Sequence, residues 1–116
     1  MNIEELRDYC LCMDNVSESM PFGPDHIVFK VYDRMFLLAD MFPFEEVLLK
    51  CDPDTAIELR DRYSEITPAF HMNKKHWNGV SVRGSLTDDF IKEQIVNSYN
   101  LVLAKVPKNK KECLEK

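Results

Sequence analysis

The sequence predicts a single α+β domain with two layers, a mainly antiparallel sheet that carries helices on one face. A length of 116 residues suits one hydrophobic core. Apolar residues make up 45% and charged residues 30%, which is an ordinary balance for a globular protein. Stretches with period-two alternation lie between stretches with helical spacing, in the order α-β-β-β-α-β-β-α. We expect the domain to span residues 1–107 and a charged tail to occupy residues 108–116.

The first half of the chain predicts one capped helix followed by three strands. Asn2 can accept backbone N–H bonds at a helix start, and apolar residues then recur at helical spacing as far as Met13. Two prolines and a glycine follow and interrupt any regular element. Beyond them the alternation has period two, so we expect strands at residues 27–32, 35–40 and 46–51.

The second half of the chain predicts two helices that enclose two short strands. Asp52 is a good N-cap and Pro53 is tolerated at the first helical position. Pro68 confines its strand to an edge or a bulge. Thr87 and the two aspartates after it suit another helix start, and Pro107 ends that helix. The expected elements are a helix at 53–63, strands at 66–70 and 78–83, and a helix at 87–106.

The sequence predicts a cytoplasmic chain that does not enter a membrane. The longest apolar run, residues 35–39, is far shorter than the roughly 20 residues that span a bilayer. Acidic residues stand near the start, where a signal peptide would be basic and then apolar. Because reducing compartments keep thiols free, we expect no disulfide among the four cysteines, which are Cys10, Cys12, Cys51 and Cys113.

The net charge of −5 is unevenly distributed along the chain. Residues 1–70 hold 6 Lys and Arg against 15 Asp and Glu, whereas residues 71–116 hold 9 against 5. A basic second half is compatible with nucleic-acid binding, because polyanions respond to local patches of charge. The alternative is that the two halves neutralise each other on the folded surface.

One segment is richer in chemistry than the rest, the string His71-Met72-Asn73-Lys74-Lys75-His76-Trp77-Asn78. It contains two of the three histidines and the only tryptophan. Together with Gly84-Ser85-Leu86, this string resembles the MmcQ/YjbR family. The resemblance extends over nearly the whole chain, through Pro21-Phe22-Gly23, Leu49-Lys50, Asp52-Pro53, Glu58-Leu59-Arg60, Ser98-Tyr99, Leu101-Val102, Lys105 and Pro107-Lys108.

The resemblance implies a fold and one biochemical activity. Members of the family share the layout given above, which is similar to that of secretion chaperones, and the family is also compared with the frataxin-like CyaY fold. They are often described as DNA-binding, with paired β-wings that engage the duplex. Arg83 departs from the family pattern and makes the segment more basic, whereas Gly79 and Val96 lack a usual hydroxyl and carboxylate and weaken a shared polar site.

The spacing of the polar residues predicts no enzyme, no metal and no cofactor. His71 and His76 are five positions apart, which does not place them on one helical face, and no Cys-x-x-Cys pair exists. A site assembled in space with Cys51 stays an open alternative. No spacing pairs a nucleophile with a base, and the three glycines form no phosphate-binding loop.

DNA binding is the leading functional hypothesis for the string and the strand that follows it. Cationic, amide and imidazole groups contact phosphates and bases, and the candidates are Lys74, Lys75, His76, Asn78 and Arg83. Three neighbours are expected to structure the loop, namely His71, Asn73 and Trp77. A tryptophan before a strand suits a core anchor, and either asparagine can bond the loop backbone instead of a ligand.

The alternative hypothesis is a protein–protein interaction or chaperone-like module that binds no nucleic acid. An exposed strand edge or the acidic first half could hold a protein partner or support a homodimer. Salt separates the two hypotheses, because polyanion binding weakens steeply with salt and an apolar interface hardly responds.

Overall fold

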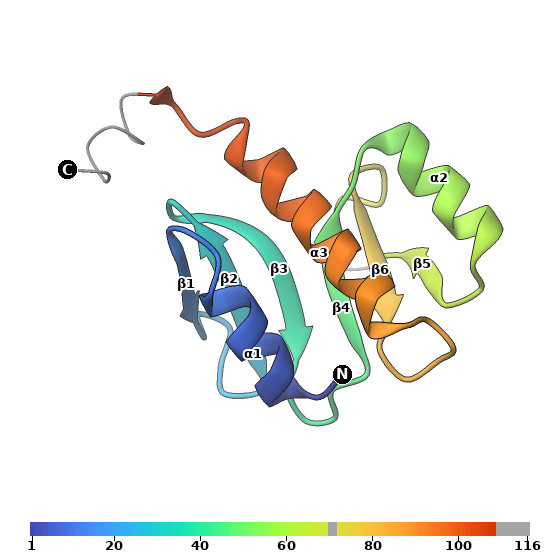
Figure 1. The fold of residues 1–116 in the computed structure, drawn as a ribbon, viewed down its shortest axis with the longest axis horizontal. Coiled ribbons are helices and arrows are strands. Elements are labelled where there is room, and N and C mark those ends of the chain that lie inside the picture. The colour runs from blue at the N-terminus through green and yellow to red at the C-terminus, as the bar shows by residue number, and fades with distance from the viewer. Residues whose placement is uncertain (70–71, 109–116) are drawn as a thin grey trace.

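The computed structural model of the chain describes residues 1–69 and 72–108 (Figure 1). Within these residues the chain forms three helices and six strands. In chain order they are α1 (Ile3–Leu11), β1 (Val16–Ser19), β2 (His26–Val31), β3 (Arg34–Asp40), β4 (Glu46–Lys50), α2 (Pro53–Arg62), β5 (Ile66–Pro68), β6 (Trp77–Ser81) and α3 (Asp88–Leu103). The predicted α+β class is confirmed, and the predicted elements follow one another in the predicted order.

The six strands form one antiparallel sheet in the spatial order β1-β2-β3-β4-β6-β5. Short connections join β2, β3 and β4, so these strands are neighbours in sequence and in space. The chain then crosses through α2 and β5, and β6 returns to pair with β4 (Figure 1). The short strands β1 and β5 therefore form the two edges of the sheet.

The structure adds β1, a strand that the sequence analysis did not predict. Asn15 has a φ of 63°, a left-handed conformation that asparagine tolerates, and it turns the chain after α1. Val16 then pairs with Val31 of β2. Arg7 of α1 holds Glu18 in an ion pair with an Nη2–Oε1 distance of 2.6 Å. A four-residue strand with one apolar side chain shows too little periodicity to be predicted. Its position follows from these tertiary contacts instead.

The helices cover one face of the sheet, as expected. α1 and α3 lie side by side across it (Figure 1). Their apolar residues join those of β2, β3 and β4 in one core that includes Leu6, Cys10, Ile27, Phe29, Val31, Leu37, Val47, Leu49, Ile91, Ile95 and Val102. α2 lies beside β5 and β6, where the carbonyl of Ala56 accepts a bond from Asn78 Nδ2 at 3.4 Å. No helix in the described part of the chain is long and apolar enough to cross a membrane.

A β-bulge in β3 changes which face of the sheet the side chains before and after it occupy. Phe29 pairs with Leu37 but Lys30 pairs with Met35, so Phe36 is an extra residue in β3. Phe36 and Leu37 are both fully buried in the core beneath the helices. Met35 instead packs with a small second cluster on the other face. The bulge therefore gives the helix-free face an apolar side chain at this end of β3.

The described cysteines are free thiols, as predicted for them. Cys10 is buried, and its burial raises the pKa of the thiol to about 12, so the group stays protonated. Burial also raises the pKa of the half-buried Cys51 thiol, whereas Cys12 is exposed. Cys113 lies outside the described residues, as does the predicted tail beyond Lys108.

Candidate functional site

The face of the sheet opposite α1 and α3 carries an apolar stripe. Alternation along β2, β3 and β4 places Val28, Leu38 and Leu48 on this face, and the strand register aligns them side by side. The aligned position in β6 is Gly79. We call these four positions the apolar row.

A polar row lies beside the apolar row, at one end of the strands. His26 pairs in register with Asp40, and His26 Nδ1 lies 2.6 Å from Asp40 Oδ1. The pair Ala39–Val47 fixes the register between β3 and β4, so the next residues, Asp40 and Glu46, are neighbours on adjacent strands. We call His26, Asp40 and Glu46 the polar row. It combines two carboxylates and one imidazole at the edge of an apolar surface.

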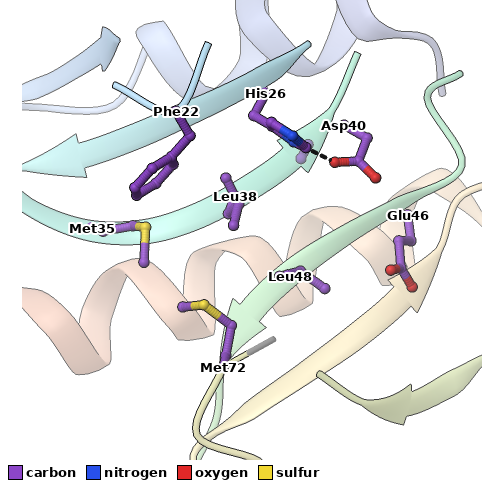
Figure 2. A pocket seen from close by; sticks show the side chains of 9 residues that line it. Phe22, His26, Met35, Leu38, Asp40, Glu46, Leu48 and Met72 are labelled. Atoms are coloured by element: carbon purple, nitrogen blue, oxygen red, sulfur yellow. Dashed lines mark hydrogen bonds and ion pairs between the residues drawn. The ribbon is translucent and has the colours of Figure 1, made fainter. Parts of the chain in front are cut away.

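A pocket of about 410 Å³ opens on this face (Figure 2). Leu38 and Leu48 form its floor, while Phe22 and Met72 reach over it from two different loops. Met35 lies at one end, and the polar row lies at the other. We call this hollow the sheet-face pocket. Its volume falls in the range of roughly 300–1,000 Å³ that is typical of ligand sites.

The rim of the sheet-face pocket exposes apolar surface to solvent. Phe22 is 64% exposed although it is a large aromatic residue. Leu48 of the pocket floor also belongs to a small buried cluster with Ala69 and Trp77, against which Met72 packs. The pocket therefore has a fixed floor, and its walls carry an exposed aromatic ring and a flexible thioether. Methionine side chains adapt to varied apolar partners.

Gly79 makes room for the carboxylate of Glu46. A Cβ atom at position 79 would lie 2.8 Å from Glu46 Oε2 and 3.2 Å from Thr67 Oγ1. The first distance is too short for two unbonded heavy atoms, so any side chain here would displace Glu46. The glycine thus allows Glu46 to lie across β6, next to the pocket.

The residues of the predicted string form a tight loop before β6. Lys74 and Lys75 are exposed, and His76 is half-buried. The side-chain oxygen of Asn73 accepts a bond from the backbone N–H of Lys75 at 3.0 Å. The backbone carbonyl of Asn73 accepts a bond from the backbone N–H of Trp77 at 2.9 Å. Trp77 itself is 9% exposed. His71 lies outside the described residues.

The structure corrects the placement of Asn78 and separates Arg83 from the lysines. Asn78 is 1% exposed, and its Oδ1 accepts a bond from Arg60 Nε at 2.7 Å, so it is withdrawn from any ligand. Arg83 follows β6, whereas Lys74 and Lys75 precede it. The five residues of β6, at about 3.3 Å each, separate Arg83 from the two lysines by roughly 17 Å. Arg83 Nε donates to the carbonyl of Phe44 at 3.2 Å.

Lys74 and Lys75 lie near further basic residues that the sequence analysis did not bring together with them. The pKa of Lys50 is lowered, first by partial burial and then by repulsion from Lys105 and Arg34. The N–H of Cys51 donates to the carbonyl of His76 at 2.7 Å, which places the loop of the string beside the end of β4. We call Arg34, Lys50, Lys74, Lys75 and Lys105 the basic edge. These residues come from four separate parts of the chain, so no single segment reveals them.

The polar row was also missed, although a weak signal for it exists. His26, Asp40 and Glu46 each stand at the end of a strand and in phase with the apolar row of the same strand. Their meeting depends on the register between strands, which the alternation within one strand does not determine. Among the described residues, no group of three or more His, Cys, Asp or Glu side chains is arranged to hold a metal ion.

The fold and the sequence can be compared with known proteins. The sequence model of the YjbR family matches residues 11–101, which is most of the chain. This chain belongs to the YjbR family. The uncharacterized protein YjbR of Escherichia coli K12 is 31% identical over 115 residues, which cover 98% of each chain. The uncharacterized protein YbdF of Escherichia coli O157:H7 is 36% identical over 86 residues, covering 72% of this chain and 69% of YbdF.

A solved structure of a YjbR-like protein has the same fold. The crystal structure of Deinococcus radiodurans protein DR2400, which carries the domain DUF419, is 33% identical and superposes with a TM-score of 0.90. The match covers 98% of this chain and 88% of the Deinococcus chain. Since the two Escherichia coli relatives are named as uncharacterized, membership of the YjbR family gives the fold but no activity.

Proposed function

We propose that this YjbR-family domain binds an extended apolar segment of another protein in the sheet-face pocket. The observation that carries the proposal is an apolar hollow of about 410 Å³ on the sheet face that the helices leave uncovered. Exposed apolar surface rimmed by polar residues is typical of interaction sites. The absence of catalysis, the absence of a cofactor and the cytoplasmic location stay predictions from the sequence.

The shape of the pocket favours a peptide over a small enclosed ligand. Its floor follows β3 and β4, and its walls come from loops on either side, Phe22 before β2 and Met72 before β6. Small-molecule sites usually bury most of the ligand surface inside a cavity. A trough bounded by one aromatic and two methionine side chains instead suits the alternate side chains of an extended segment.

Phe22→Ala should weaken peptide binding at least about tenfold without unfolding the domain. Removing a ring that a peptide would cover takes away about 1.5–3 kcal/mol of apolar burial, and about 1.4 kcal/mol corresponds to tenfold in affinity. Because Phe22 is 64% exposed in the free protein, its loss should hardly change the unfolding midpoint. Peptides are first selected on the wild-type protein from a random dodecapeptide phage library. The selected peptides are then labelled, and fluorescence anisotropy measures their affinities for both proteins.

Phe42→Ala is the matched control for this experiment. Phe42 is 72% exposed and does not line the sheet-face pocket, so its removal should leave the affinities unchanged. Equal losses in both variants, or a library that yields no peptide dependent on Phe22, would rule out binding in this pocket.

Binding of duplex DNA at the basic edge is a second candidate function. The specific observation in its favour is the repulsion that Lys105 and Arg34 exert on Lys50, since such a gathering of like charges suits a polyanion. Lys74 and Lys75 extend the same edge through the contact between Cys51 and His76.

Lys74→Glu/Lys75→Glu should weaken DNA binding and flatten its salt dependence, by about 0.9 in the log–log slope for each phosphate contact removed. Anisotropy with a short duplex at several salt concentrations measures this slope. Arg83→Gln serves as the control, because Arg83 lies at the opposite end of β6 and should change little. Absence of wild-type binding even at low salt would eliminate the DNA hypothesis.

A further inference from the structure

We infer that Arg60 of α2 is a positioning residue for the sheet-face pocket, because it holds in place the loop that carries Met72 over the pocket. This role rests on the proposed function, since it concerns what keeps one wall of the peptide site in position. Arg60 does not line the pocket itself. It acts through residues 72–76, which precede β6 and which we call the Met72 loop.

Backbone bonds fix the internal shape of the Met72 loop. The N–H of Met72 donates to the carbonyl of Ala69 at 3.0 Å. The carbonyl of Asn73 accepts bonds from the N–H groups of His76 at 3.1 Å and Trp77 at 2.9 Å. The N–H of Ala69 donates to the carbonyl of Trp77 at 3.2 Å, which closes the base. These bonds join the loop to itself and to its base, so its tilt over the sheet depends on contacts from outside.

Arg60 ties the middle of the loop to α2 and β6. Its Nη2 donates to the backbone carbonyl of Lys74, and its Nε donates to Oδ1 of Asn78 at 2.7 Å. Asn78 is buried in β6, and its Nδ2 donates to the carbonyl of Ala56 at 3.4 Å, so it is a fixed anchor for the guanidinium. Both donors of Arg60 belong to one planar group, which holds the two acceptors at a fixed separation. The loop is therefore held two residues after Met72.

The side chain of Met72 depends on the position of its backbone. It packs on the small buried cluster that includes Leu48 and Trp77, and it reaches over the pocket, as Figure 2 shows. A flexible thioether adapts to its surroundings, so these apolar contacts direct it only weakly. The bonds of the half-buried guanidinium are charge-assisted and stronger than the neutral backbone bonds of the loop. Loss of Arg60 should therefore displace the Met72 wall and leave the floor of the pocket unchanged.

Arg60→Ala should weaken the Phe22-dependent peptides selected on the wild-type protein about tenfold, as Met72→Ala should, because each change removes the thioether from the ligand. If Arg60 acts through Met72, the double variant should also lose about tenfold, whereas two independent losses would multiply to about a hundredfold. Arg62→Ala is the matched control and should retain full affinity. It removes the same charge from the last turn of α2, but Arg62 is exposed and lies over the ring of Tyr63.

A second measurement needs no peptide. With the methionine methyl groups labelled with ¹³C, the NMR signal of Met72 in the free protein should shift and broaden in Arg60→Ala. The signal of Met13, which packs on the core beneath the helices, should stay in place. Arg60→Lys keeps the charge but lacks the planar fork that reaches both acceptors, so it should change the Met72 signal in the same way. Should Arg60→Ala not fold, Arg60→Lys decides the inference by both measurements.

Three results would overturn the positioning role of Arg60 and leave the proposed function intact. They are Phe22-dependent peptides that bind equally well to Arg60→Ala and the wild type, losses that multiply fully in the double variant, and an unchanged Met72 signal in the Arg60 variants. A library that yields no peptide dependent on Phe22 would instead overturn the proposed function, together with any role of Arg60 in peptide binding.

Discussion

Trp77→Ala is expected to lower the free energy of unfolding by about 3–5 kcal/mol, the range for deleting a buried large aromatic residue. Trp77 is only 9% exposed and packs on Leu48 and Ala69, on the sheet face that has no helix above it. Since no helix covers this face, no second layer can move in to fill the space that the ring leaves next to Leu48. Chemical denaturation at an unchanged m-value measures the loss.

His76→Ala is the neighbouring control, because His76 is half-buried and contributes mainly backbone bonds to the loop. Its effect should stay within about 1 kcal/mol. A loss below about 1 kcal/mol for Trp77→Ala would show that the ring faces a ligand and does not support the core. That result would return the tryptophan to the group of candidate binding residues.

The helices were predictable because their signals are local. Asn2 and Glu5 form a complete capping box, and the side chains of Asp52 and Thr87 accept the backbone bonds expected of N-caps. Apolar spacing then identifies the buried side of each helix. β1 was not predictable in the same way, because its position follows from the left-handed turn at Asn15 and from pairing with β2.

The candidate sites were harder to predict because they depend on strand register. Lys74 and Lys75 are exposed as a basic string suggests, but the strand that follows carries Arg83 to the far end of the sheet. Asn78 meets α2, so its burial reflects a contact that its neighbours in sequence do not indicate. Asp40 and Glu46 are six positions apart in sequence but adjacent across two strands. Period-two alternation gives the face of each side chain, and only the register gives its neighbours.

Ser98→Ala is expected to destabilise the domain by about 2–4 kcal/mol, because it would leave one buried and one partly buried backbone group without this partner, at about 1–3 kcal/mol each. Ser98 is fully buried in α3. Its Oγ donates to the carbonyl of Phe36 at 2.6 Å and accepts from the N–H of Lys50 at 2.9 Å. One hydroxyl thus joins α3 to the bulge of β3 and to the end of β4.

The two bonds of Ser98 also explain why alanine cannot replace serine by packing alone. The carbonyl of Phe36 belongs to the residue that the bulge inserts in β3, where the regular pairing of strands is interrupted. Asn97→Ala, on the exposed side of the same helix, is the control and should change stability by no more than about 0.5 kcal/mol. Thermal and urea unfolding of both variants provide the comparison. Equal stability of Ser98→Ala and the wild type would mean that water or a shifted backbone satisfies both groups, and that the hydroxyl does not hold α3 on the sheet.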